Sequence, residues 1–299
     1  GCWKYRVSPA RILLMRPDHL GDLLLTTPAI HQLREAYPNA TLHALVGPWS
    51  ADILANNPDL DAVITLAYPG FSRTPKRSLR SPYELAFSTA RLLRRIAYDS
   101  ALILRPDHWW GALVAHLAGI PQRIGYALPD VSPFLTTALE HRHEHVVLQS
   151  AELVDVLVGS KTKREALTLQ FPLLETDQHW IAGYLEGWNI DERDYLIAIH
   201  PGSGTWVKRW EDDRWALVAD TLHEQLGAHI VFTGSDQELP MISGIVAQMK
   251  HTPILLVGDA NIGQLAALYA RSLVVLGPDS GPLHLAAAVG TPTVTLFGP

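Results

Sequence analysis

Four loops of the sequence carry residue types that can activate a hydroxyl group or hold a phosphate. The first follows the apolar run Arg11–Arg16 and contains the pair Gly21-Asp22. A carboxylate in such a loop can act as a general base, and a glycine lets the backbone turn tightly or approach a ligand. Aspartate is also favoured at helix starts, so the spacing alone favours a helix cap at Asp22 over a catalytic base.

The other three loops have the chemistry of phosphate binding. Residues 200–210 (HPGSGTWVKRW) place small residues beside Lys208, residues 277–284 (GPDSGPLH) lead into a predicted helix, and residues 233–236 (TGSD) form a similar loop. Backbone N–H groups, a lysine and the positive end of a helix dipole all stabilise phosphate. The lysine loop has neither the Walker nor the dinucleotide-binding pattern. Each loop also fits a structural turn or cap, but four at equivalent strand ends favour a site.

Short apolar runs alternate with amphipathic stretches, which is typical of parallel sheets built from βα units. The predicted strands cover residues 11–16, 40–46, 62–66, 101–104 and 123–126, then 196–200, 229–233, 254–257, 273–276 and 293–297. The predicted helices of the first half cover residues 28–37, 83–97, 110–118 and 146–158. A proline-containing stretch without a period at residues 170–174 predicts a linker between domains at residues 1–170 and 171–299.

Two sheets in tandem predict a cleft between them, and ligands of such sheets bind beyond the carboxyl ends of the strands. The four loops follow predicted strands, so they are expected at that cleft. The second series stops soon after a strand, where a covering helix is expected. We therefore expect the second domain to be truncated at its end.

Composition narrows the class of protein. The chain has 299 residues, 47% of them hydrophobic and 18% charged, which is typical of packed globular domains. A net charge of −6 argues against general nucleic-acid binding. The one cysteine, Cys2, cannot form an internal disulfide and favours a reducing compartment. The first residues predict a strand and not a secretory signal, and no run of about 18 apolar residues occurs, so we expect a cytoplasmic protein with at most peripheral membrane contact.

Basic residues gather in one segment of this acidic chain. Between residues 73 and 95 the only acid is Glu84, and the basic residues are Arg73, Lys76, Arg77, Arg80, Arg91, Arg94 and Arg95. Such a segment binds anionic groups or a membrane surface, or is a solvated helix face.

Two other clusters are interpreted as structural. The alternating histidines of residues 140–145 predict an exposed turn and not a metal site. The pair Trp109-Trp110 favours packing over stacking on a sugar.

Four segments together carry a family resemblance. They are ILLMRPDHLGDLLLTTPAI (residues 12–30), IAIHPGSGTWVKRW (197–210), IVFTGSDQE (230–238) and LVVLGPDSGPLHLAAAVGTPTVTLFGP (273–299). In this order they resemble glycosyltransferase family 9, the ADP-heptose:lipopolysaccharide heptosyltransferase family. The resemblance implies the GT-B architecture, in which two Rossmann-like domains face each other across a cleft. It further implies that residues 1–170 bind the acceptor and residues 171–299 the nucleotide sugar.

The resemblance also implies roles for individual residues. Asp22 matches the aspartate that deprotonates the acceptor hydroxyl, and Lys208 matches a lysine that steadies the donor phosphates. The implied donor-binding residues are Gly21, Ser203, Gly204, Thr205, Thr233, Gly234, Asp236, Glu238, Asp279, Ser280, Gly281 and His284. The implied acceptor-binding residues are Arg73, Lys76, Arg77 and Arg80, which suit the phosphates and carboxylates of a lipopolysaccharide core.

The expected reaction is inverting transfer of a heptose from ADP-heptose to a lipopolysaccharide inner-core or other lipid-linked acceptor, without a cofactor or an obligatory metal. Asp212-Asp213 predicts a helix start and not a magnesium site. The partners expected are the nucleotide sugar, the acceptor and the cytoplasmic face of the inner membrane, and not nucleic acid. Three alternatives remain: transfer from another nucleotide sugar, nucleotide-sugar epimerisation, and an inactive homologue that only binds the sugar nucleotide.

Overall fold

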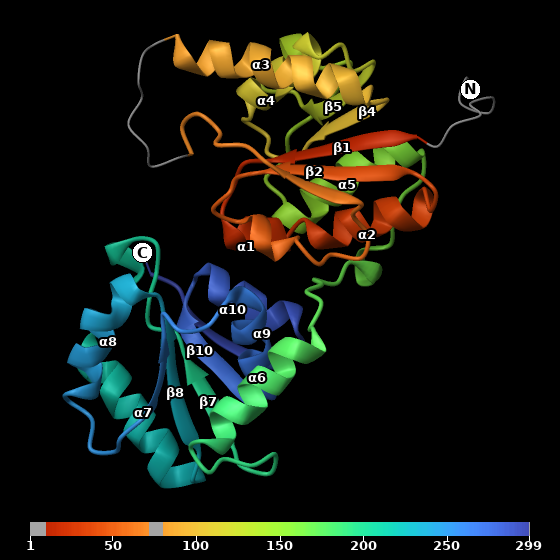
Figure 1. Ribbon diagram of the computed structural model, residues 1–299. Helices are drawn as coiled ribbons and strands as arrows, with labels where there is room; N and C mark the ends of the chain where they lie inside the picture. The colour runs from red at the N-terminus through yellow and green to blue at the C-terminus, as the bar shows by residue number, and fades with distance from the viewer. Residues whose placement is uncertain (1–9, 72–79, 299) are drawn as a thin grey trace. The chain divides into compact units, whose positions relative to one another are not determined.

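The protein consists of two α/β units, as the alternating pattern predicts. The computed structural model describes residues 10–71 and 80–298. The chain divides into the compact units Gly1–Leu169 and Gln170–Pro299. Each unit contains a parallel β-sheet with helices on both of its faces (Figure 1).

The first unit has a six-stranded sheet in the order β3-β2-β1-β4-β5-β6, with every pair parallel. The strands are β1 (Arg11–Arg16), β2 (Thr41–Val46), β3 (Ala62–Thr65), β4 (Ser100–Ile103), β5 (Gln122–Tyr126) and β6 (Thr137–Leu139). The central strands are apolar runs buried on both faces, which is why the sequence predicts them. The edge strand β6 was missed, because its three residues are half-buried or exposed and show no continuous apolar run.

Helices cover this sheet in two pairs. Helix α2 (Thr27–Ala36) packs against α5 (Val146–Val158), and α3 (Ser81–Ile96) packs against α4 (Trp109–Leu117) on the other face (Figure 1). A short helix, α1 (Leu20–Leu24), follows β1 directly. Short 3₁₀ turns lie at Ala51–Ile53, Ser132–Phe134 and Arg164–Ala166.

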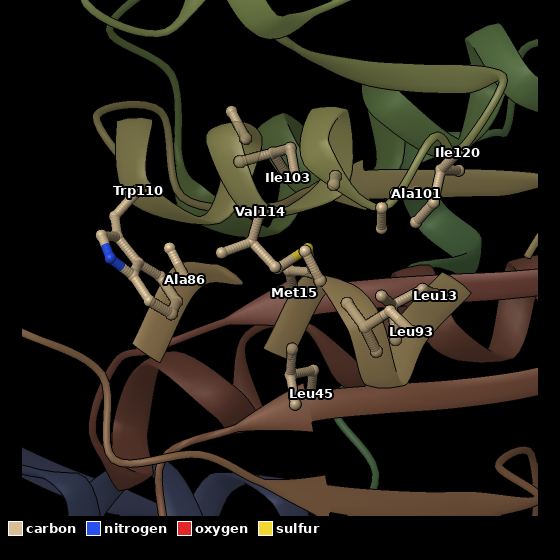
Figure 2. Close-up of a cluster of buried hydrophobic side chains, with 14 of the residues drawn as sticks. Leu13, Met15, Leu45, Ala86, Leu93, Ala101, Ile103, Trp110, Val114 and Ile120 are labelled. Atoms are coloured by element: carbon tan, nitrogen blue, oxygen red, sulfur yellow. The ribbon is translucent and has the colours of Figure 1, made fainter. Parts of the chain in front are cut away.

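The core between the first sheet and α3 and α4 holds the end of β1 in place. Leu13 and Met15 of β1 are completely buried against Leu93 of α3 and Val114 of α4 (Figure 2). A side chain of this size contributes about 1.5–3 kcal/mol when it is fully buried. The backbone that leads out of β1 into the loop before Asp22 is therefore fixed by packing.

The second unit has a five-stranded sheet in the order β11-β10-β7-β8-β9, also entirely parallel. Its strands are β7 (Leu196–Ile199), β8 (His229–Gly234), β9 (Ile254–Val257), β10 (Val274–Pro278) and β11 (Thr293–Leu296). Its helices are α6 (Glu175–Glu186), α7 (Asp212–Leu226), α8 (Leu239–Val246), α9 (Ile262–Arg271) and α10 (Gly281–Ala288), with 3₁₀ turns at Trp206–Lys208 and Asp236–Glu238. Across both units the predicted elements end within two residues of the observed ends.

Two cores hold this sheet, one on each face. Ile199 and Phe232 pack against Trp215 of α7 and Ile242 of α8, whereas Leu196 packs against Leu268 of α9 and the residues of α6. Because the strands are parallel, the loops after β7, β8, β9 and β10 leave the sheet at one edge. None of the described helices is long and apolar enough to cross a membrane.

Candidate functional site

Asp22 lies in the first turn of α1, directly beyond the carboxyl end of β1. The N-cap of this helix is His19, so Asp22 is the third helical residue and the interpretation of Asp22 as the cap residue is wrong. A carboxylate in the first turn of a helix is stabilised by the positive end of the dipole. The side chain keeps 43% of its surface exposed, so a substrate hydroxyl can reach it.

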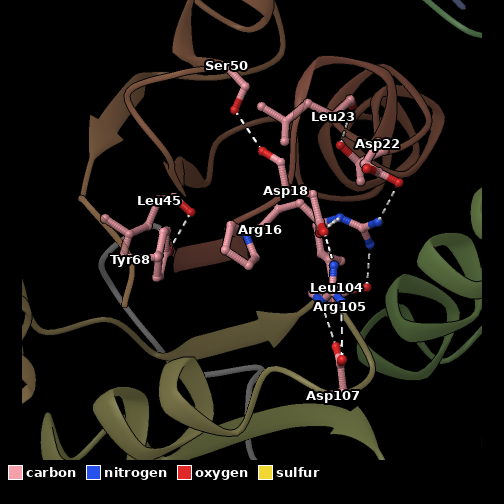
Figure 3. Close-up of polar contacts among 12 residues, drawn as sticks. Arg16, Asp18, Asp22, Leu23, Leu45, Ser50, Tyr68, Leu104, Arg105 and Asp107 are labelled. Atoms are coloured by element: carbon pink, nitrogen blue, oxygen red, sulfur yellow. Dashed lines mark hydrogen bonds and ion pairs between the residues drawn. The ribbon is translucent and has the colours of Figure 1, made fainter. Parts of the chain in front are cut away.

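A chain of ion pairs connects Asp22 with the loop after β4. Asp22 Oδ1 lies 3.6 Å from Nη2 of Arg16, and Nε of Arg16 lies 2.6 Å from Oδ2 of Asp18 (Figure 3). Asp18 is also paired with Arg105, which contacts Asp107 through Nε at 2.5 Å and Nη2 at 3.1 Å. Carboxylates and guanidinium groups thus alternate along one edge of the first sheet.

The inner members of this chain are buried and held by the backbone. Arg16 donates from Nη1 to the carbonyl of Leu104 at 2.7 Å, and Ser50 donates to the carbonyl of Asp18 at 2.9 Å. Burial lowers the pKa of the Arg16 guanidinium, and the charges of Asp18 and Asp22 offset part of this shift. Burial opposes the charge of Arg105 as well, but the hydrogen bonds and charges of Asp107 and Asp18 raise its pKa above the ordinary value. Arg16 therefore holds a positive charge 3.6 Å from the Asp22 carboxylate.

The second unit contains a cavity at the carboxyl edge of its sheet, about 500 Å³ in volume. Loops after all four strands β7, β8, β9 and β10 contribute to it. Its lining consists of His200, Gly202, Ser203, Gly204, Gly234, Ser235, Asp236, Glu238, Gly258, Ala260, Asn261, Ile262, Leu265, Ser280, Gly281 and Pro282. Cavities of this volume hold a small organic ligand.

Two glycines bring the loops of this cavity into close contact. A Cβ atom on Gly202 would lie 1.7 Å from Oε1 of Glu238, and one on Gly258 would lie 1.8 Å from Oδ1 of Asp236. Gly258 also has a φ of +80°, a conformation that other L-residues rarely adopt. Any larger residue at either position would displace the acidic side chains that line the cavity.

The loop after β8 contains two acidic residues, and they make different contacts. Oε2 of Glu238 accepts hydrogen bonds from the backbone N–H of Ser235 at 2.8 Å and from its hydroxyl at 2.9 Å, which completes a capping box. Asp236 lies in the same turn, and its carboxylate is near Gly258 at the cavity wall. Glu238 therefore stabilises the loop, and Asp236 is the better placed of the two to bind a ligand.

Lys208 and the loop after β10 form one charged cluster. Nζ of Lys208 lies 2.5 Å from Oδ2 of Asp279, and Nε2 of His284 lies 3.8 Å from the other oxygen of the same carboxylate. Ser280 is the N-cap of α10, and Gly281 is its first residue. The Oγ atom of Ser280 is buried without a hydrogen-bond partner among the described residues, and the residue itself lines the cavity.

A buried polar chain supports the cavity from within the sheet. His200 Nδ1 lies 3.1 Å from Thr233 Oγ1, which lies 3.0 Å from the hydroxyl of Tyr269. Burial lowers the pKa of His200 and keeps its ring neutral at physiological pH. Thr233 is completely buried, so its side chain supports the site from behind and does not face a ligand.

The structure thus brings together most of the donor-binding residues that the resemblance implies for the second half. Ser203, Gly204, Gly234, Asp236, Glu238, Ser280 and Gly281 line the cavity, with Asp279 and His284 next to them. Thr205 is exposed in the same loop, and Gly21 belongs to the first unit. Sequence reasoning missed the β9–α9 loop, residues 258–262, although the rule that ligands bind beyond strand ends applies there too.

The predicted acceptor-binding residues are only partly within the described structure. Arg73, Lys76 and Arg77, like Cys2, lie outside the described residues, whereas Arg80 is exposed at the residue preceding α3. In the histidine segment, His145 is the N-cap of α5 and accepts from the backbone of Val147. No group of three or more metal-ligating side chains occurs in residues 10–71 and 80–298. Asp212 begins α7, which confirms the predicted helix start.

Comparison with known proteins decides the family. The model of glycosyltransferase family 9 (heptosyltransferase) matches residues 86–299. The chain belongs to this family. Lipopolysaccharide heptosyltransferase 3 of Escherichia coli K12 is 28% identical over 292 residues, which cover 93% of this chain and 79% of that protein.

Solved structures of the family have the same fold. A glycosyltransferase family 9 protein from Veillonella parvula has a TM-score of 0.85 at 26% identity, covering 99% of this chain and 83% of its own. Escherichia coli ADP-heptose lipopolysaccharide heptosyltransferase II has a TM-score of 0.77 at 22% identity, covering 95% and 84%. The fold is GT-B, as predicted, and the enzyme is a glycosyltransferase.

Proposed function

We propose that this enzyme transfers a heptose from ADP-heptose, with inversion, to a lipopolysaccharide inner-core acceptor. The observation that carries the proposal is the cavity in the second unit, where Lys208 and the start of α10 lie beside a space of about 500 Å³. The named relatives supply the sugar and the acceptor, because they are lipopolysaccharide heptosyltransferases and one is specified as using ADP-heptose. Family membership favours transfer over the epimerase alternative.

The reaction needs a base for the acceptor and positive charge for the leaving group. Asp22 takes the proton from the acceptor hydroxyl, whose oxygen then attacks the anomeric carbon of the donor. The bond from that carbon to the diphosphate oxygen breaks, and ADP leaves from the opposite face, so the configuration inverts. Lys208 and the N–H of Gly281 stabilise the departing diphosphate, and neither group requires a metal.

We place the nucleoside of the donor in the same cavity. Asp236 is placed to accept hydrogen bonds from the ribose hydroxyls, while Glu238 holds the loop through its capping box. Ile262 and Leu265 of α9 offer an apolar surface for the base. Asp279, paired with Lys208 and near His284, orients the lysine toward the phosphates.

A lipid-linked acceptor requires that the enzyme approach a membrane, and α3 has a suitable face. Tyr83 and Phe87 are 53% and 62% exposed, and they are four residues apart, so they lie on one side of the helix. Arg91, Arg94 and Arg95 are exposed on the same helix, where Glu84 is the one acidic residue. Aromatic side chains beside arginines suit the surface of an anionic bilayer. We assign this face to peripheral contact with the inner membrane at its cytoplasmic side.

Donor turnover in the presence of a truncated lipopolysaccharide acceptor tests the proposal. Wild-type protein should release ADP and extend the acceptor, and Asp22→Asn should lower kcat by about 10²–10⁴-fold, as expected when a general base is lost. Asp213→Asn on α7 is the matched control, because Asp213 is exposed and does not line the cavity.

The outcomes separate the alternatives. Undiminished transfer by Asp22→Asn would contradict the proposal that Asp22 is the general base. Turnover of donor without an acceptor to an epimeric sugar nucleotide would favour the epimerase, and tight ADP binding without transfer to any acceptor would favour the inactive homologue. Faster transfer from a different nucleotide sugar would keep the enzyme class and replace the donor.

A further inference from the structure

A second cavity lies in the first unit and has no role in the mechanism above. It is about 490 Å³ in volume and opens at the loops after β3, β4 and β5. The side chains that matter for its chemistry are Phe71, Arg105, Asp107, His108, Trp109 and Asp130. Cavities of this size with a few polar groups among aromatic side chains bind small molecules.

The cavity wall offers aromatic surface. Trp109, the first residue of α4, is 39% exposed, while its neighbour Trp110 is buried and donates from its indole to the carbonyl of Pro82 at 3.0 Å. The Arg105 guanidinium lies 5.0 Å from the centre of the Phe71 ring. The packing that the sequence favours for this pair holds for Trp110, whereas Trp109 is partly exposed and lines the cavity.

The polar groups of the cavity are matched to hydroxyl groups. Asp107 is held by two contacts from Arg105 but keeps 60% of its side chain exposed, and Asp130 is exposed as well. Ionised carboxylates accept hydrogen bonds from neighbouring hydroxyls. One positive and two negative side chains give these lining residues an excess of one negative charge. The described lining residues therefore do not favour an anionic occupant.

His108 adds an aromatic ring to the cavity wall. Its side chain is buried, with the residue 4% exposed, and neither ring nitrogen has a hydrogen-bond partner among the described residues. The ring packs against Tyr68 and Phe71 at centroid distances of 5.0 and 6.1 Å. Both nitrogens are enclosed by protein atoms, so the His108 ring forms an aromatic part of the cavity wall and offers no polar contact to a ligand.

We infer that this cavity binds a neutral pyranose ring of the acceptor, with Trp109 as its stacking platform and Asp107 and Asp130 as hydroxyl acceptors. The inference rests on the proposed transfer to a saccharide acceptor. The location agrees with that role, since Arg105 of the cavity belongs to the ion-pair chain that runs through Asp18 and Arg16 to Asp22. A sugar bound here contacts the same network that positions the base.

Binding of isolated sugars by the full-length protein tests the inference without any transfer assay. The probes are methyl α-mannopyranoside as a neutral pyranoside and a methyl glycoside of an acidic sugar, each followed by saturation-transfer NMR. The neutral glycoside should bind wild type and Trp109→Phe, and its signal should fall at least fivefold in Trp109→Ala and in Asp130→Asn. Trp188→Ala is the matched control, because Trp188 is 48% exposed in the other unit.

Steady-state kinetics distinguishes the loss of a sugar-binding subsite from a general loss of enzyme activity. With a saccharide acceptor, Trp109→Ala and Asp130→Asn should raise the acceptor KM about tenfold or more, with kcat at saturating acceptor within about twofold and ADP affinity unchanged. Equal binding of the neutral glycoside by wild type and both variants would overturn the inference, as would preferential binding of the acidic sugar at this cavity. If Asp22→Asn loses transfer but still binds the glycoside, both proposals are supported. If the wild type binds the glycoside but transfers no sugar, the subsite is supported and the proposed function is contradicted.

Discussion

At the scale of single residues, some side chains are proposed to take part in the reaction, and other side chains hold them in position. Lys208 is the clearest chemical group of the second unit, because its ammonium lies against Asp279 while 40% of the side chain remains exposed. Replacing it with alanine removes the charge that we propose to stabilise the leaving diphosphate. We expect Lys208→Ala to lower kcat by roughly 10²–10³-fold, the usual effect of losing one such stabilising group.

Steady-state kinetics with saturating acceptor checks this expectation, with Lys250→Ala as control because Lys250 pairs with Glu224 on the surface. A loss of kcat equal to that of the control would contradict the role of Lys208.

His108 makes the stability of the first unit depend on pH. Burial and the charge of Arg105 lower its pKa from about 6.5 to about 3, so the folded protein keeps the ring neutral. Below about pH 6.5 the unfolded chain binds a proton that the folded chain does not, and the folded state loses about 1.4 kcal/mol per pH unit. Above pH 6.5 the full stability is present. Between pH 6.5 and 5 the wild type should therefore lose about 2 kcal/mol that His108→Leu retains.

Urea denaturation at pH 7.5 and pH 5 measures this difference. His179→Leu is the control, because His179 is exposed on α6. If His108→Leu loses as much stability on acidification as wild type, the buried neutral imidazole is not the source.

The sequence predicted Asp22 and Lys208 through a resemblance and not through their spacing. Position alone favoured a cap at Asp22, and only the folded loop shows that His19 is the N-cap. The opposite holds for Glu238, which resembled a ligand-binding acid but completes a capping box with Ser235. An aspartate or glutamate near a helix start satisfies either role, and what decides is which backbone N–H its oxygens reach.

At the scale of elements, helix α3 has a buried side and an exposed side, and the exposed side can be tested for membrane binding. Its buried side contacts α4, while Tyr83 and Phe87 face away from the core beside the arginines. Each arginine near an anionic surface contributes about 1 kcal/mol, so Arg91→Gln with Arg95→Gln should weaken vesicle binding about 30-fold. Replacing Tyr83 and Phe87 with serine should weaken it at least tenfold, because apolar surface is no longer buried in the bilayer.

Co-sedimentation with vesicles that contain anionic phospholipid measures this partitioning at low and high salt. Leu217→Ser on α7 is the matched control, since Leu217 is 65% exposed on the other unit. Binding that is insensitive to the α3 substitutions would assign the membrane contact elsewhere.

The elements themselves were largely predictable because each buried strand is an apolar run bounded by loops. Ile254–Val257 and Val146–Val158 were predicted to the residue. Tertiary context decided the rest. β6 is held by pairing with β5 and not by its own apolar content, and the β9–α9 loop carries no charged group at the cavity wall that would have marked it.

At the scale of the whole molecule, the two units have separate cores and separate cavities. The four loops of the second unit surround the cavity that we assign to the nucleotide, and the loops after β3, β4 and β5 surround the cavity that we assign to an acceptor sugar. Because both cavities are at carboxyl ends of parallel strands, each substrate is expected to order the loops of one unit first. The assignment of one ligand to each unit therefore predicts in which loops each ligand restricts backbone motion.

Hydrogen exchange of the full chain measures that restriction directly. ADP should give its largest protection in residues 200–209, 234–238, 258–262 and 279–284, since these loops surround the donor cavity. A neutral glycoside should instead protect the loop that contains Asp107 and Trp109. Asp236→Asn should reduce the ADP effect without changing the glycoside effect, because ribose hydrogen bonds are lost in the second unit alone. Larger ADP protection around Asp107 than around Asp236 would reverse the assignment of the two cavities, and with it the roles of the two units.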